Sequence, residues 1–161
     1  MFKLNKGAEY AILGMLFMAE KRDKGFSYIW EIAEAKGMPK AYLAKIFQVL
    51  SGKGLVRSLR GKDGGFVLAR PSRSITLLEI IEAVEGPVCV NDCIEKRGWC
   101  EKEADCALFL VLAECHDRFI EVLGGRSLDS LVAKERVEPR MNSAARLAGR
   151  MDFKFFNVGL T

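Results

Sequence analysis

The sequence predicts a mainly α-helical protein with a small β-hairpin wing, in which a winged helix-turn-helix precedes a long C-terminal dimerisation helix. Apolar residues recur at helical spacing through the first third of the chain. Two short segments of β-forming residues then flank a glycine-rich loop. A later segment repeats apolar residues at steps of four and three, as in helix–helix seams. We therefore expect a winged helix-turn-helix domain over residues 1–87, a cysteine-rich loop over 88–105, a dimerisation helix and a short following helix over 106–134, and a tail over 135–161.

Three helices are expected before the glycine-rich loop. Residues 6–21 place their apolar side chains on one face of a helix. Ser27 is suited to cap a second, short helix over residues 28–36. Pro39 suits the first turn of a third helix over 39–52, because its missing N–H has no partner there anyway. The third helix is expected to bury Tyr42, Leu43, Ile46, Phe47 and Leu50.

The segment after the third helix predicts a β-hairpin. Leu55–Arg60 and Phe66–Arg70 are rich in β-forming residues, and the loop between them holds three glycines. A hairpin directly after a helix-turn-helix is typical of a wing, which lies along the phosphate backbone while the third helix enters the major groove.

The remaining helices are predicted from caps and spacing. Thr76 and Glu79 form a capping box for a helix over residues 77–85. A long helix is expected from Asp105 to Leu123, and a short one over 127–134. The seam of the long helix suits either packing on a second copy of the chain or an intramolecular core. That seam consists of Leu108, Leu112, Cys115, Phe119 and Val122.

Basic residues gather between Lys36 and Arg73, where Asp63 is the only acid. Such a local surplus is expected of a nucleic-acid face, although it also fits a solvated surface. The partner that suits this fold is double-stranded DNA. The residues expected to contact it are Lys40, Ala41, Tyr42, Lys45 and Gln48 on the third helix, and Arg57, Arg60, Lys62 and Gly64 in the wing.

The chain contains five cysteines. The apolar stretch 11–19 is too short to span a bilayer and no cleavage site follows it, so we expect a cytoplasmic protein with reduced thiols and no membrane partner. Cys93, Cys100 and Cys106 lie close together with Cys89 upstream, which indicates a metal or redox site. An iron–sulfur cluster, zinc and a metal-free thiol switch all remain open, and the absence of paired C-x-x-C motifs favours the cluster. Cys115 is expected to be a small buried hydrophobe.

Taken together, these segments resemble the Rrf2 family of bacterial winged-helix regulators over about residues 2–134. The resemblance rests on LNKGAEYA, MPKAYLAKIFQVLSGKGLVRS, RGKDGGFVLARP, ITLLEIIEAVEGP and the cysteine loop. It implies a homodimeric transcription regulator, such as a repressor, whose two recognition helices and two wings meet one promoter operator. It also implies that Cys93, Cys100 and Cys106 hold a 2Fe-2S or 4Fe-4S cluster that senses redox poise, nitric oxide or iron–sulfur status.

The fourth ligand of such a cluster differs among members of the family. IscR-like members use a histidine three residues after the last cysteine, and that position is Phe109 in this chain. NsrR-like members use an acidic residue from the first helix of the partner subunit, and the matching residue is Glu9. Cys89 is an alternative, and His116 is a poor substitute. Loss of the cluster would free Glu9, shift the first helix against the dimer helix and change the affinity for DNA.

Other classes of protein fit the sequence less well. There is no phosphate-binding glycine loop, no nucleophile elbow and no histidine–carboxylate pair with suitable spacing, so we do not expect an enzyme. The alternative within the same fold is a regulator with a zinc site or a thiol switch. A metal-storing or structural protein without DNA binding is disfavoured by the basic wing.

Overall fold

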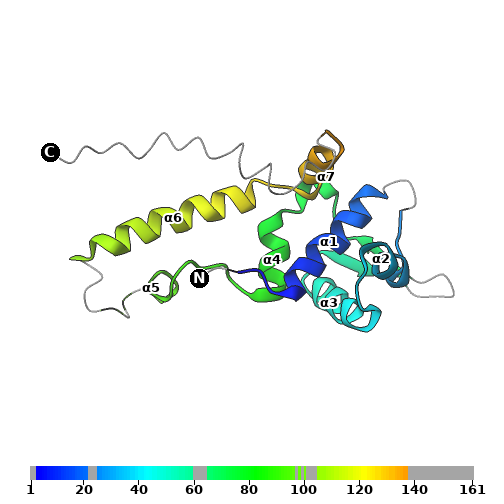
Figure 1. Cartoon of the computed structure of the whole chain (residues 1–161), viewed down its shortest axis with the longest axis horizontal. Helices are drawn as coiled ribbons and strands as arrows, with labels where there is room; N and C mark the ends of the chain where they lie inside the picture. Colours follow the sequence, from blue (N-terminus) through cyan, green and yellow to red (C-terminus); the bar gives the residue numbers. More distant parts are fainter. Residues whose placement is uncertain are drawn as a thin grey trace.

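The computed structural model describes residues 3–21, 25–59, 65–96, 98, 100 and 105–137. Four helices surround a two-stranded hairpin, and a long helix extends away from this group (Figure 1). The mainly helical fold with a hairpin wing is therefore confirmed. The elements are α1 (Lys6–Glu20), α2 (Ile29–Lys36), α3 (Lys40–Gly52), β1 (Val56–Ser58), β2 (Phe66–Leu68), the 3-10 helix η2 (Ser72–Ser74), α4 (Leu77–Glu85), α5 (Asp92–Glu95), α6 (Ala107–Gly124) and α7 (Leu128–Val137).

The core forms where α1 crosses α3 and α4. Asn5 caps α1 by accepting a hydrogen bond from the Ala8 N–H at 2.8 Å. Gly14 lets α3 approach closely, since a Cβ atom there would lie 2.8 Å from the Phe47 ring. Phe47 itself is fully buried and packs edge-on against Phe66, with ring centroids 5.1 Å apart. This contact joins the helical core to the hairpin.

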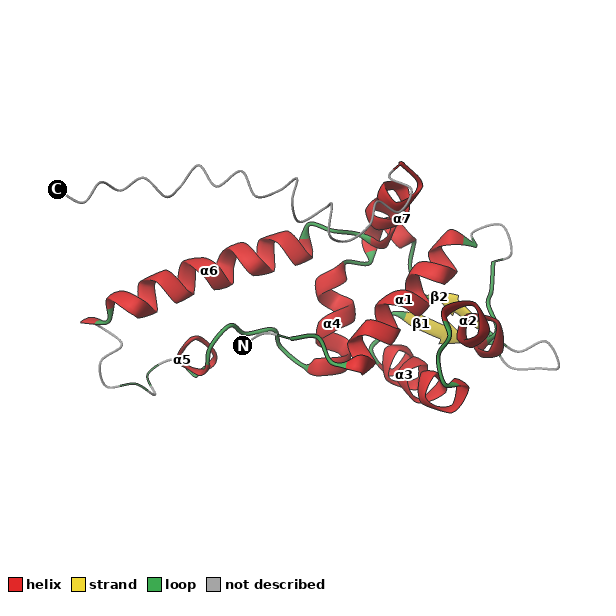
Figure 2. Ribbon diagram, in the orientation of Figure 1, coloured by secondary structure: helices red, strands yellow, loops and turns green. Residues whose placement is uncertain are grey.

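The start of α2 differs from the sequence prediction. Ser27 does not cap the helix, and Tyr28 occupies the cap position instead. Ser27 is 2% exposed and pairs with Phe66, donating its N–H at 2.9 Å and accepting at 2.8 Å. Because the Ser27 backbone is held extended by this pairing, the helix begins one residue later than predicted. The pairing adds a single-residue bridge beside β2, the second strand of the two-stranded hairpin drawn in Figure 2.

The hairpin is antiparallel, with Val56 opposite Leu68 and Ser58 opposite Phe66. Its strands are shorter than predicted, although the Leu59 N–H still donates to the Gly65 carbonyl at 2.8 Å. Gly65 lies against the Ser27 carbonyl, and a Cβ atom would be 2.8 Å from that oxygen. The tip of the wing lies outside the described residues.

The predicted capping box at the start of α4 is confirmed. Thr76 Oγ1 accepts from the Glu79 N–H at 3.2 Å, and the Thr76 N–H donates to Glu79 Oε2 at 2.9 Å. Arg70 donates to the same carboxylate at 2.9 Å. Burial alone would raise the pKa of Glu79, but the hydrogen bonds from Thr76 and Arg70 outweigh it and lower that pKa below its ordinary value.

The long helix α6 packs against α4 and α5 on one side, and none of its residues is buried. It ends one residue later than predicted, with Gly125 at its C-cap. The segment before it, predicted as a loop, contains the single-turn helix α5. The chain then returns to the winged-helix domain, where Leu128 donates to the Ile75 carbonyl at 2.9 Å and Leu77 donates to the Arg126 carbonyl at 2.8 Å. No helix in the part of the chain that the structure describes is long and apolar enough to cross a membrane.

Candidate nucleic-acid interface and cysteine site

One face of α3 is available to a partner. Leu43, Ile46, Phe47 and Leu50 are buried, so the helix period turns the opposite face outward. Lys40, Lys45 and Gln48 lie on that outward face, and Ala41 is exposed beside them. This face and the hairpin lie at the end of the molecule remote from α6 (Figures 1 and 2).

Tyr42 was expected in the core, and this prediction is wrong. Its side chain is 43% exposed, and its ring packs edge-on to Tyr10 with centroids 5.8 Å apart. Its hydroxyl lies 3.2 Å from the position that a Cβ atom on Gly7 would take. Tyr42 therefore packs on the start of α1 with one side of its ring in solvent, beside the outward face of α3.

The basic residues of the wing fall into separate groups. Arg57 is exposed on β1, opposite Val67. Arg70 is paired with Glu79, so much of its charge is neutralised within the chain. The predicted DNA contacts Arg60, Lys62 and Gly64 lie outside the described residues.

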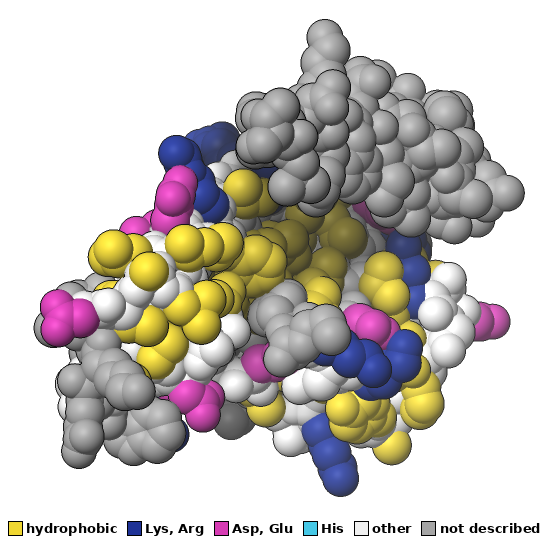
Figure 3. Space-filling view, turned by 60° about the vertical axis from the view of Figure 1, so that its left-hand side comes forward, with side chains coloured by type: hydrophobic (Ala, Val, Ile, Leu, Met, Phe, Trp, Pro, Cys, Tyr) yellow, Lys and Arg dark blue, Asp and Glu magenta, His cyan; other side chains and the backbone are white. Residues whose placement is uncertain are grey.

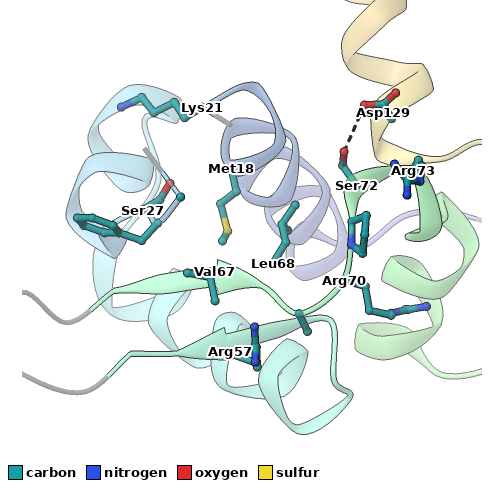
Figure 4. Close-up of a pocket in the computed structure, with 14 residues that line it drawn as sticks. Met18, Lys21, Ser27, Arg57, Val67, Leu68, Arg70, Ser72, Arg73 and Asp129 are labelled. Carbon is teal, nitrogen blue, oxygen red and sulfur yellow. Dashed lines mark hydrogen bonds between the residues drawn. The ribbon is translucent and has the colours of Figure 1, made fainter. Parts of the chain in front are cut away.

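A cavity of about 540 Å³ lies between the end of α1, the hairpin, η2 and α7 (Figure 4). Lys21, Arg57, Arg70 and Arg73 contribute to its lining. Lys21 is engaged with Glu31, 4.0 Å away, and the Ser72 hydroxyl donates to Asp129 at 3.2 Å across the junction with α7. The cavity therefore lies at the junction between the hairpin and α7, and the Ser72–Asp129 hydrogen bond joins η2 to α7 beside it.

The sequence analysis missed an aromatic group beside the hairpin. Phe26 meets Tyr28 edge-on, Tyr28 stacks on Trp30, and Trp30 is 51% exposed at the end of this series of rings. Alternating aromatic residues are a strand-like pattern. That signal was present in the sequence, but the prediction of a helix from Tyr28 onward obscured it.

The three clustered cysteines line one cavity of about 230 Å³ between α5 and the start of α6. Asn91 caps α5 and accepts from the Cys93 N–H at 3.4 Å, and Cys106 is the N-cap residue of α6. The structure thus brings Cys93, Cys100 and Cys106 together, as the sequence predicted. The other lining residues are Asn91 and the apolar Leu108, Phe109 and Leu112.

The proposed alternatives for a fourth ligand lie elsewhere in the same chain. Cys89 does not line the cavity, and its thiol donates to the Asn91 carbonyl at 3.2 Å. His116 lies further along α6, where its buried Nδ1 has no hydrogen-bond partner among the described residues. Glu9 forms an ion pair with Lys6 at the start of α1, and its carboxylate raises the pKa of Lys6 through a hydrogen bond.

The donor set fits an iron–sulfur cluster. Three thiols surround a largely apolar cavity, which is the environment that such clusters use. No three histidine, cysteine, aspartate or glutamate side chains of the described residues are grouped closely enough to hold a single metal ion as placed. All five cysteines are free thiols.

The outer face of α6 is apolar over much of its length. The predicted seam is divided in the structure, since Leu108, Cys115 and Val122 are exposed whereas Leu112 and Phe119 face their own chain. The expected burial of Cys115 is therefore wrong for the single chain, because no helix of the described residues packs on that side of α6. Figure 3, which brings the α6 end forward, shows a broad hydrophobic patch with charged side chains at its rim. The exposed large hydrophobic residues of α6 are Leu108, Leu110, Val111 and Val122.

A winged helix-turn-helix with a basic recognition face, joined to a long helix with an apolar outer side, defines a transcriptional regulator rather than an enzyme. The chain belongs to the Rrf2 family, whose model is described as an iron-dependent transcriptional regulator and matches residues 4–134. Protein aau3 of Rhizobium meliloti is 34% identical, covering 87% of this chain and 89% of that protein.

Two further relatives bear on the sensing site. The HTH-type transcriptional regulator IscR of Xenorhabdus nematophila is 32% identical, over 84% of this chain and 82% of that one. The structure of CymR, the global cysteine regulator of B. subtilis, superposes with a TM-score of 0.68 and is 28% identical, covering 83% of this chain and 98% of that one. Both relatives are regulators, in agreement with the family.

Proposed function

We propose that this protein is a homodimeric repressor in the bacterial cytoplasm that binds promoter DNA under the control of an iron–sulfur cluster held by Cys93, Cys100 and Cys106. One observation carries the proposal, namely that these three thiols line a single apolar cavity at the start of the helix with the exposed apolar face. When bound, a cluster would supply a centre that oxidants or nitric oxide alter. The type of cluster, 2Fe-2S or 4Fe-4S, is left to the measurement below.

The walls of the cavity support this assignment. Leu108, Phe109 and Leu112 give it an apolar side that limits the access of water to the sulfur atoms. Cys106 is the N-cap residue of α6, so one of the three thiols lies at the very start of that helix. A change in the ligation of Cys106 therefore acts directly on the end of the helix proposed to form the dimer.

The apolar face of α6 supports the homodimer. A soluble chain rarely leaves such a row of residues in water without a partner. Leu108, Val111, Cys115 and Val122 follow steps of three, four and seven residues, and all are exposed. A second copy of α6 packed along this row would bury them by the same pattern that forms coiled-coil seams.

Glu9 of the partner subunit is the proposed fourth ligand. Within its own chain the carboxylate is held by Lys6 and its side chain is 39% exposed, so it is accessible to a second subunit. To act as a ligand, the Glu9 carboxylate must release the Lys6 ammonium before it binds iron. Glu9→Ala should therefore alter the cluster spectrum and its lifetime while the unfolding transition of the protein stays unchanged. An unaltered spectrum would remove Glu9 from the site and return attention to Cys89.

The decisive experiment is an assay of iron and acid-labile sulfide on protein purified without oxygen, with a visible spectrum of the same sample. We expect a coloured protein with matching iron and sulfide, whose ratio to protein separates the two cluster types. Cys106→Ala should abolish the colour, whereas Cys115→Ala, at an exposed cysteine outside the cavity, should retain it. A colourless parent protein would refute the cluster.

A thiol switch is the second candidate, and the three free thiols that line one cavity favour it. Two of the cavity thiols would then form a disulfide, releasing two protons and passing two electrons to a peroxide or disulfide oxidant. Titration of free thiols before and after mild oxidation tests this candidate. A colourless protein that reversibly loses two thiols would support it, and stoichiometric zinc would support the zinc alternative.

A further inference from the structure

We propose that the groove between α2, α3 and the hairpin holds a stretch of the sugar–phosphate backbone of duplex DNA, with Trp30 as a contact residue. This inference rests on the proposed binding of DNA. It adds a third element to the interface, beside the outward face of α3 and the wing.

Trp30 is a large aromatic side chain held in an exposed position. Its ring stacks on Tyr28 with centroids 5.8 Å apart and an interplanar angle of 17°, and Phe26 meets Tyr28 edge-on at 5.2 Å. The side chain therefore loses little conformational freedom when a partner packs against it. With 51% of its surface in solvent, it presents an apolar plane and an indole N–H together.

Trp30 forms one wall of a groove of about 280 Å³. Lys40, the first residue of α3, forms part of another wall, and Ser58, Leu59 and Gly65 at the base of the hairpin close the groove. The groove thus lies between the start of the recognition helix and the wing. Both elements lie at the end of the molecule remote from α6 (Figures 1 and 2). A DNA strand that passes from the major groove at α3 to the wing must cross this region.

The chemistry of the lining suits a sugar–phosphate backbone. Lys40 is the only charged residue among the described residues that line the groove, and none of those residues carries a carboxylate that would repel a phosphate. Its ammonium and the Ser58 hydroxyl are donors for phosphate oxygens, and the indole N–H of Trp30 is a third. The indole face offers an apolar surface for a deoxyribose. None of these groups reads a base edge, so the groove supplies affinity without choosing a sequence.

The walls of the groove are fixed relative to one another. The two hydrogen bonds between Ser27 and Phe66, at 2.9 and 2.8 Å, join the segment before α2 to strand β2. The ring contacts run from Phe26 through Tyr28 to Trp30. The pairing of Ser27 with Phe66 therefore also fixes the position of Trp30 relative to the hairpin. The groove is therefore preformed, and the contact requires no rearrangement of the protein.

Fluorescence anisotropy of the full-length chain, prepared without oxygen, tests the proposal. The probes are a duplex that the protein itself selects from a random-sequence pool and a scrambled duplex of the same composition. We expect Trp30→Ala to weaken binding to both duplexes by about tenfold, as for a lost hydrogen bond to a charged group, and to leave their ratio unchanged. Trp30→Phe should recover part of the loss, because it keeps an aromatic plane without the N–H. Leu13→Ala, at an exposed hydrophobic residue of α1 outside the groove, is the matched control and should bind like the parent.

A second readout follows the indole directly. Trp30 and Trp99 are the two tryptophans of the chain, so Trp99→Phe leaves Trp30 as the sole reporter. Its emission should shift or quench on addition of either duplex. Parent-like binding by Trp30→Ala, an unmoved emission, or a loss confined to the selected duplex would each overturn the proposal. A parent protein that binds neither duplex would instead refute the DNA-binding function itself.

Discussion

The pairing of Ser27 with Phe66 leads to a specific prediction for Gly65. A methyl group added at this position would lie 2.8 Å from the Ser27 carbonyl oxygen and 3.3 Å from the Phe26 ring. The obstructing oxygen belongs to the backbone, so it moves away only if the two chain segments separate. Separation breaks the hydrogen bonds between Ser27 and Phe66. At about 1 kcal/mol of net stability for each bond, Gly65→Ala should lower the free energy of unfolding by about 2 kcal/mol.

Gly52→Ala is the matched control. Gly52 is the last residue of α3, and the new methyl group would meet no neighbouring atom within 4 Å of its position. Both substitutions reduce the entropy of the unfolded chain by the same amount, so the difference between them isolates the clash. Urea unfolding measures both free energies, and Gly52→Ala should be neutral or stabilising by up to about 1 kcal/mol. Suppose that Gly65→Ala has the same free energy of unfolding as Gly52→Ala, and that the amide protons of Ser27 and Phe66 exchange no faster than in the parent. The pairing of Ser27 with Phe66 would then not hold the hairpin in place.

Further predictions concern α4, α6 and the DNA face. Thr76→Ala should cost about 1 kcal/mol in urea unfolding, because the Glu79 N–H loses its cap. The pKa of Glu79 is lowered in the folded protein, so its contribution to stability is present above its ordinary value of 4.5 and is lost as the pH falls through the lowered value. The stability difference between the parent and Glu79→Gln should therefore shrink below that pH and stay constant near neutrality. If α6 forms the proposed dimer seam, analytical ultracentrifugation should show a dimer for the parent and a monomer for Val111→Asp, with the same helical circular dichroism spectrum for both. Lys45→Ala should weaken binding to all duplexes. It should also reduce the slope of log K against the logarithm of the salt concentration by about one unit, and an unchanged slope would show that Lys45 makes no phosphate contact.

The helices and their caps could be predicted from the sequence because each depends on neighbouring residues. The capping box of Thr76 and Glu79 and the buried positions of α3 follow from spacings of three and four. The hairpin was also predictable, since β-forming residues flank a glycine-rich loop. Its strands are shorter than the pattern indicates because strand length depends on the partner as well as on the residues within the strand.

The errors share a physical cause, which is contact between residues distant in the sequence. Ser27 was expected to cap α2, but Phe66 captures its backbone. Tyr42 follows the apolar period of α3, yet the start of α1 covers only one edge of its ring. Cys115 lies on the exposed side of α6, where the proposed homodimer would place a second copy of the helix. In each case the local pattern was present, and tertiary packing determined the outcome.

The cysteine site was partly predictable. Clustering along the sequence indicated that three thiols would meet, and α5 and α6 bring them to one cavity. The sequence does not identify a fourth ligand, because Phe109 occupies the position three residues after Cys106, where IscR-like members have a histidine. In the proposed homodimer this ligand comes from a second subunit, whose approach no local pattern encodes.

The length of α6 gives the molecule a mechanical property. With 18 residues the helix is about 27 Å long, and it rejoins the winged-helix domain through the short pairing of Thr76 with Ser127. The helix therefore behaves as a rigid lever with its pivot at one end and Cys106 at the other. A tilt of about 10° about the pivot corresponds to a displacement of about 5 Å at the cysteine end. In the proposed homodimer, such a tilt would change the separation of the two recognition helices and so their match to the two half-sites of one operator.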